Sequence, residues 1–107
     1  MTPRDVNPTQ GFRAPDESLR NDWQVEETYW RSNWQSRPYT SADLGFGFYG
    51  PAYRYGYESA RRNRSRRWEE LEIELRGGWD RYEHRSKAPW ENVKEAVRDA
   101  WNRARGY

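Results

Sequence analysis

The sequence contains no cysteine and no long apolar run. Without cysteine the chain has no disulfide framework, no thiolate metal site and no thiol nucleophile. No apolar stretch approaches the roughly 18 residues that span a membrane, and the first ten residues lack the apolar segment of a signal peptide. We therefore expect a cytoplasmic protein that makes no membrane contact.

Aliphatic side chains and lysine are also scarce. Leu, Ile, Val and Phe together number 12, whereas the aromatic residues number 18. Of the 19 basic residues only Lys87 and Lys94 are lysines, and the rest are arginines, which stack on rings and bind carboxylates or phosphates with two N–H groups. With a net charge of only +2, this composition favours a folded domain whose core is built from Trp and Tyr.

Few residues are suited to catalysis. His84 is the only histidine, and it follows Tyr82 and Glu83 at a charged helix end, where a cation beside solvent is the ordinary interpretation. The sequence lacks the motifs of zinc proteases, serine hydrolases, phosphate-binding loops and dinucleotide-binding folds. We expect a protein that is not an enzyme, with no catalytic residue, no cofactor and no metal site.

Tryptophan recurs every eleven residues, once as a pair and once as an unbroken series of four. These are Trp23 with Trp34, then Trp68, Trp79, Trp90 and Trp101. Eleven residues are close to three helical turns, so these rings share one face of a helix. The segment from Trp68 to Trp79 also aligns with the segment from Trp90 to Trp101, and Trp23 to Trp34 is a more distant copy with Glu26 at an aliphatic position.

This pattern predicts an all-α fold, a small bundle of four helices. Residues 67 to 85 and 89 to 105 form a C-terminal antiparallel hairpin, with Pro89 in the first turn of its second helix and Ser86 as the cap. Gly77 and Gly78 either end the first helix or allow close approach to Ala100. The predicted core consists of Trp23, Trp30, Trp34, Trp68, Leu71, Leu75, Trp79, Trp90, Val93, Val97 and Trp101.

Two segments are predicted to lie outside the regular helices. Residues 1–15 are rich in proline and polar residues and are expected to form a flexible N-terminal arm, which leaves 16–107 as a single helical domain. Residues 44 to 50 are rich in glycine and aromatic residues and predict a loop, after which Pro51 opens a short helix. The core of this loop, Gly45 to Phe48, weakly resembles the aromatic strand of an RNA-recognition motif, but its flanks are helical, which favours an aromatic plug over the tryptophans.

Basic and tyrosine side chains near the middle of the chain are the candidate contact residues for nucleic acid or for a protein partner. An arginine cluster either contacts phosphates or forms a solvated face paired with the glutamates of residues 69 to 74. The tyrosines either form an exposed, adhesive surface or pack over the helices. The candidates are Arg54, Arg61, Arg62, Arg64, Arg66, Arg67, Tyr53, Tyr55 and Tyr57.

Five short motifs follow one another along residues 22 to 103. They are Tyr29-Trp-Arg31, Arg37-Pro-Tyr39, Pro51 to Gly56, the helix from Trp68 to Leu71, and Val97 to Trp101. This order resembles that in a group of short, uncharacterised bacterial proteins, a resemblance that implies no activity. The spacing of Trp90 and Trp101 is also loosely similar to small general-stress proteins of the CsbD-like type, although their Gly- and Lys-rich pattern is missing.

Together these observations predict a non-enzymatic interaction or scaffold protein of bacterial stress type. Exposed Tyr and Arg would mediate self-association, as a homo-oligomer, or binding to a protein partner. The alternative is a nucleic-acid-binding protein that contacts phosphates through the cluster from Arg61 to Arg67.

Overall fold

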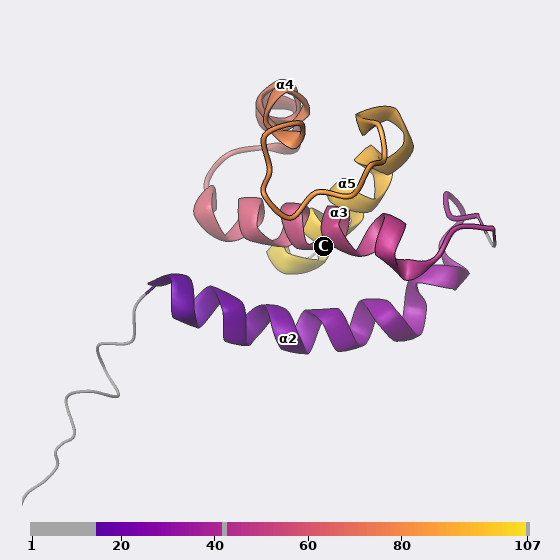
Figure 1. Cartoon of the computed structure of the whole chain (residues 1–107). Helices are drawn as coiled ribbons and strands as arrows, with labels where there is room; N and C mark the ends of the chain where they lie inside the picture. The colour runs from indigo at the N-terminus through magenta and orange to yellow at the C-terminus, as the bar shows by residue number, and fades with distance from the viewer. Residues whose placement is uncertain (1–14, 42, 107) are drawn as a thin grey trace, which may run out of the picture.

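The computed structural model describes residues 15–41 and 43–106, and all the regular secondary structure in this part of the chain is helical (Figure 1). It contains the helices α2 (Pro15–Asn33), α3 (Phe46–Arg62), α4 (Trp68–Trp79) and α5 (Trp90–Arg105), and a single 3-10 turn, η1 (Trp34–Ser36). The all-α, four-helix prediction is confirmed. The predicted N-terminal arm lies outside the described residues except for Pro15, which begins α2.

Helix α3 is at the centre of the packing. Its most extensive contact is with α5, and α2 packs on another side of α3. Figure 1 shows α2 and α3 side by side and running in opposite directions. Aromatic contacts join Trp23 of α2 to Tyr57, and Trp34 of η1, directly after α2, to Tyr49. Helix α4 makes a smaller contact with α5.

Small residues allow α3 and α5 to approach closely. Ala52, Gly56 and Ala60 recur every fourth residue on α3, and all are buried. A Cβ atom on Gly56 would overlap the backbone carbonyl of Val97 in α5. Glycine is therefore required at residue 56 by the close approach of the two helices.

The core is aromatic, as the composition indicates. All eleven residues predicted for the core are buried. The rings of Trp30 and Tyr53 stack with centroids 4.0 Å apart and planes 6° from parallel, whereas Trp68 meets Trp101 edge-on at 6.0 Å. Both arrangements are favourable for aromatic pairs and contribute about 0.5–1.5 kcal/mol beyond the burial of area.

The predicted aromatic loop before Pro51 is wrong, because residues 46 to 50 are the first turns of α3. Among the described glycines only Gly106 has a positive φ, so the glycines of this segment impose no turn. Gly50 instead makes room for the ring of Phe46, which a Cβ atom at residue 50 would meet at 2.7 Å. Pro51 lies inside the helix and does not open it.

The C-terminal part of the chain differs from the predicted hairpin in two ways. α4 continues through Gly77 and Gly78 but ends at Trp79, short of the predicted residue 85. Gly78 does lie at a close approach, but its neighbour is the Tyr55 hydroxyl of α3 and not Ala100. α5 also packs mainly on α3, so the contact between α4 and α5 is a minor part of the core.

Residues 80–89 form a loop that returns to α3. Trp79 donates its indole N–H to the Ala88 carbonyl at 2.7 Å, and Ser86 donates its hydroxyl to the Phe48 carbonyl at 2.9 Å. Ser86 therefore does not cap α5, whose N-cap residue is Pro89 without a side-chain cap. These bonds fix the position of His84 relative to α3.

Candidate functional site

Three of the short sequence motifs meet in one hydrogen-bonded cluster. Arg37 donates to both carboxylate oxygens of Asp99, at 2.6 and 3.3 Å, and Tyr39 donates to Asp99 at 2.7 Å. The hydroxyls of Tyr39 and Tyr53 lie 2.9 Å apart. Because Tyr39 has a single hydroxyl hydrogen and gives it to Asp99, Tyr53 is the donor between the two tyrosines. The cluster joins the segment after η1 to α3 and α5.

Burial perturbs the tyrosines of this cluster. Burial, followed by hydrogen bonds to Tyr53 and Asp99, raises the pKa of Tyr39 far above its usual value. Burial also raises the pKa of Tyr53 to about 12. Both phenols therefore stay neutral at physiological pH, and their role is to hold Asp99 and the surrounding helices in place.

A second cluster holds the loop after α4 on α3. Glu58, which is buried, accepts from Arg54 at 3.0 Å and from the Tyr82 hydroxyl at 3.0 Å. Burial, followed by the neighbouring Glu58 carboxylate, raises the pKa of Tyr82 well above its usual range. Arg54 is therefore an ion-pair partner of a buried carboxylate as well as a surface cation.

The tyrosines proposed as exposed contacts are in fact buried. Tyr53, Tyr55 and Tyr57 have exposed fractions of 0%, 9% and 4%. Tyr55 donates to the Leu75 carbonyl at 2.8 Å, and Tyr57 packs against Trp23. The prediction that these rings form a surface is wrong, because α2, α4 and α5 cover α3 on several sides.

Two arginines of the predicted cluster pair with glutamates of α4. Arg66 pairs with Glu74 at 2.6 Å, and Arg67 with Glu70 at 3.5 Å. The hydrogen bond from the backbone N–H of Arg67 lowers the pKa of Glu70, and the hydrogen bond from Arg66 lowers that of Glu74. These pairs form a solvated face of the kind that the sequence predicts as the alternative to phosphate contact.

The other arginines of the cluster lie at the C-terminal end of α3 and in the loop that follows. Arg61 pairs with Asp22 of α2 at 3.1 Å. Arg62 and Arg64 are exposed and make no ion pair within the described part of the chain. Two of the six predicted arginines are thus available as unneutralised surface cations.

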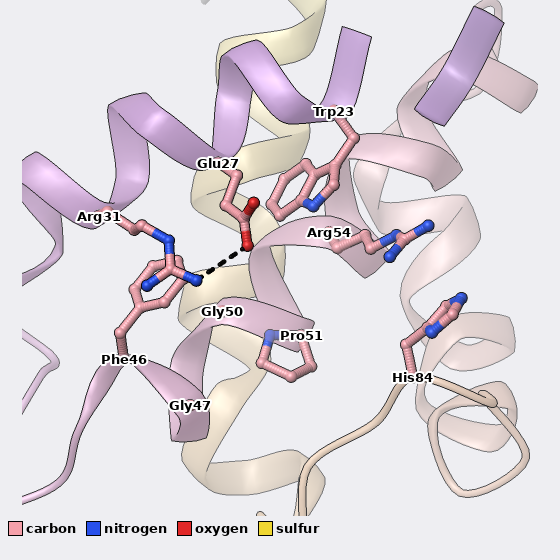
Figure 2. A pocket seen from close by; sticks show the side chains of 9 residues that line it. All are labelled: Trp23, Glu27, Arg31, Phe46, Gly47, Gly50, Pro51, Arg54 and His84. Atoms are coloured by element: carbon pink, nitrogen blue, oxygen red, sulfur yellow. Dashed lines mark hydrogen bonds and ion pairs between the residues drawn. The ribbon is translucent and has the colours of Figure 1, made fainter. Parts of the chain in front are cut away.

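A pocket of about 270 Å³ lies between α2, the first turns of α3 and the loop after α4 (Figure 2). Nine residues line it: Trp23, Glu27 and Arg31 of α2, Phe46, Gly47, Gly50, Pro51 and Arg54 of α3, and His84 of the loop. Its volume is just below the roughly 300–1,000 Å³ of small-molecule pockets, which suits an inserted side chain better than a whole small molecule.

Helical spacing explains how α2 contributes to the pocket. Trp23, Glu27 and Arg31 are four residues apart, so they lie one above another on the helix face towards α3. Figure 2 shows the three side chains projecting from α2 into the pocket. The buried ring of Trp23 forms an apolar wall, and the two charged residues lie nearer to solvent.

The first turns of α3 keep their side of the pocket open. A Cβ atom on Gly47 would meet nothing within 4 Å, so a glycine here leaves empty space at the pocket. Pro51, four residues later, has no N–H to donate to the Gly47 carbonyl. The backbone at Gly47 is therefore both uncovered and without its usual intrahelical hydrogen bond.

Two arginines border the pocket, and each pairs with a carboxylate. Arg31 pairs with Glu27 at 3.2 Å and lies 4.7 Å from the centre of the Phe46 ring, a cation–π contact. Arg54 donates its Nε–H to the Glu58 carboxylate. Figure 2 shows His84 on the opposite side, pointing towards the Arg54 guanidinium. Apolar walls bordered by cations suit an apolar group that carries negative charge beside it.

The described residues show neither a metal site nor a membrane-spanning helix. No group of three or more His, Cys, Asp or Glu residues in this part of the chain is arranged to hold a metal ion. None of its helices is both long and apolar enough to cross a bilayer.

Comparisons with protein-family models, with curated proteins and with solved structures find no match to the chain. The resemblances to short bacterial proteins and to CsbD-like stress proteins stay predictions.

Proposed function

We propose that the protein is a non-enzymatic interaction protein that binds a partner through the pocket between α2, α3 and the loop at His84. The observation that carries this proposal is the combination of an apolar wall, Trp23 with Phe46, and basic groups, Arg31 and Arg54, around an opening of side-chain size. The partner feature that fits is an aliphatic side chain flanked by carboxylates. Buried apolar contact would supply affinity, and charge would supply orientation.

Arg31 is the cation whose role can be tested without damage to the fold. Its side chain is 62% exposed, and an exposed pair such as Arg31 with Glu27 contributes only about 0.3–0.5 kcal/mol to stability. Replacing Arg54 would instead leave the buried Glu58 without its ion-pair partner. Arg31→Gln therefore tests the contribution of this cation to binding with little effect on the stability of the fold.

The test uses two short probes that differ only in charge, acetyl-Glu-Glu-Ile-Glu-amide and acetyl-Lys-Lys-Ile-Lys-amide. We expect the acidic peptide alone to shift the NMR signals of the Trp23 indole N–H and of His84. Arg31→Gln should weaken its binding several-fold, and Gly47→Leu should abolish it by filling the pocket. Gly77→Leu is the matched control, because a Cβ atom at that helical glycine also meets nothing within 4 Å and the residue does not line the pocket. Equal binding of both peptides, or unchanged binding by Gly47→Leu, contradicts the proposal.

A further inference from the structure

The exposed face of α4 carries the groups that the pocket is proposed to bind, an aliphatic side chain flanked by carboxylates. Ile73 is 80% exposed, the highest value among the large hydrophobic residues described as exposed. It lies between Glu72 and Glu74 in sequence, while Leu71 and Leu75 on either side are buried in the core. An isolated aliphatic side chain thus projects from the outer side of a packed helix.

This face is acidic. α4 contains four glutamates and one arginine between Trp68 and Trp79. Glu69 and Glu70 lie one helical turn before Ile73, so carboxylates surround the projecting side chain on the helix surface. The salt bridges from Arg66 and Arg67 neutralise Glu74 and Glu70 only in part, because both pairs are exposed to solvent.

The pocket offers an apolar opening and an exposed guanidinium to the aliphatic side chain and the carboxylates of the α4 face. The pair of Arg31 with Glu27 is exposed and only partly neutralised, whereas Arg54 already pairs with the buried Glu58 beside the pocket. Ile73 is not one of the residues that line it, so the two surfaces belong to different parts of the molecule. A surface that matches a different surface of the same chain joins copies head to tail.

We infer that the occupant of the pocket is a second copy of this chain, with Ile73 of one copy inserted between Trp23 and Phe46 of the next. The inference rests on the proposed function of the pocket and names its partner. Arg31 and Arg54 face the glutamates that flank Ile73. The contact is small, so association is weak and concentration-dependent, at the low end of interface sizes.

Two variants remove the two halves of the contact separately. Ile73→Gln removes the inserted side chain at an exposed position, and Gly47→Leu fills the pocket where a Cβ atom has free space. Val25→Gln is the matched control, since Val25 is 68% exposed and does not line the pocket. Thermal unfolding of each variant verifies that it is folded.

The experiment is sedimentation velocity of the full chain over a concentration series that reaches the millimolar range. We expect wild type and Val25→Gln to self-associate, and Ile73→Gln and Gly47→Leu each to sediment as monomers. An equimolar mixture of these two variants should again form dimers, because each keeps the surface that the other has lost. Addition of salt should weaken the association.

Two results would overturn the inference. One is a wild-type chain that stays monomeric throughout the series, and the other is an Ile73→Gln variant that associates like wild type. If the acidic peptide still binds in a manner that Gly47→Leu abolishes, the pocket has its proposed function but a different occupant. If neither the peptide nor a second copy binds, the proposed function fails as well.

Discussion

Arg37 and Asp99 are 62 residues apart in the sequence, yet the Arg37 Nε–H lies 2.6 Å from a carboxylate oxygen of Asp99. The same oxygen accepts from Tyr39. This carboxylate is thus the point at which the segment after η1 is attached to α5, and removing it leaves a cation and a phenol without their acceptor.

We predict that Asp99→Ala lowers the free energy of unfolding by about 1.5–3 kcal/mol, the usual contribution of hydrogen bonds to a charged group. Urea unfolding measures this change. The control is Glu91→Ala, which removes an exposed pair with Lys94 on the same helix and should cost no more than about 0.5 kcal/mol. Equal losses for the two variants would show that the Asp99 cluster contributes little.

Substitutions at two helical glycines should change the stability in opposite directions, because one glycine is needed for close packing and the other is not. Gly56→Ala places a methyl group against the Val97 carbonyl, and we expect a loss of about 1–3 kcal/mol or more, because two backbones must move apart. Gly77→Ala, in open space on a helix, should stabilise by up to about 1 kcal/mol. Thermal or urea unfolding of both variants checks the prediction, and a neutral Gly56→Ala would contradict the close packing of α3 on α5.

Stability should fall at alkaline pH. Burial raises the pKa of Tyr53 and that of Tyr55 to about 12, whereas a tyrosine in the unfolded chain ionises near pH 10. A raised pKa in the folded state means that this stabilisation is complete below about pH 10 and is lost as the pH rises towards 12. Urea midpoints measured over this range, together with tyrosinate absorbance, should fall as ionisation proceeds. Tyr55→Phe should show a shallower fall, and an unchanged slope would contradict the assignment.

The salt dependence of nucleic-acid binding, the alternative function, is limited by the number of arginines that can contact phosphate. Arg54, Arg61, Arg66 and Arg67 are paired with carboxylates, so unneutralised phosphate contacts fall to Arg62 and Arg64. Two contacts predict a slope of about −1.8 for log affinity against log salt on duplex DNA. Filter binding at several salt concentrations measures this slope. A slope of this size that Arg62→Gln with Arg64→Gln removes would favour nucleic-acid binding over the protein contact.

The periodic part of the fold could be predicted from the sequence, because tryptophans at helical spacing must meet inside a bundle. The start of α3 could not be predicted in this way, since the glycines at 45, 47 and 50 suggest a loop when read one by one. Gly56 allows the close contact with the Val97 backbone, and Gly50 leaves room for the ring of Phe46. The spacing of Ala52, Gly56 and Ala60 at four residues is the sequence signal that would have indicated a packed helix.

The pocket was missed for a different reason. It combines side chains from two helices and a loop, and no single segment contains its chemistry. Trp23, Glu27 and Arg31 are four residues apart and so share a helix face, but this spacing does not indicate what that face contacts. His84 was interpreted as a helix-end cation, although α4 ends at Trp79 and His84 belongs to the loop held to α3 by Ser86.

The dominance of the contact between α3 and α5 has a consequence for synthesis on the ribosome. α3 ends at Arg62 and its main partner begins only at Trp90, so α3 leaves the exit tunnel seconds before the surface that covers it. During that interval only α2 and, once it has emerged, α4 can cover its tyrosines. Nascent chains that pause before Trp90 should therefore bind chaperones, and faster translation of residues 63–89 should shorten this exposure.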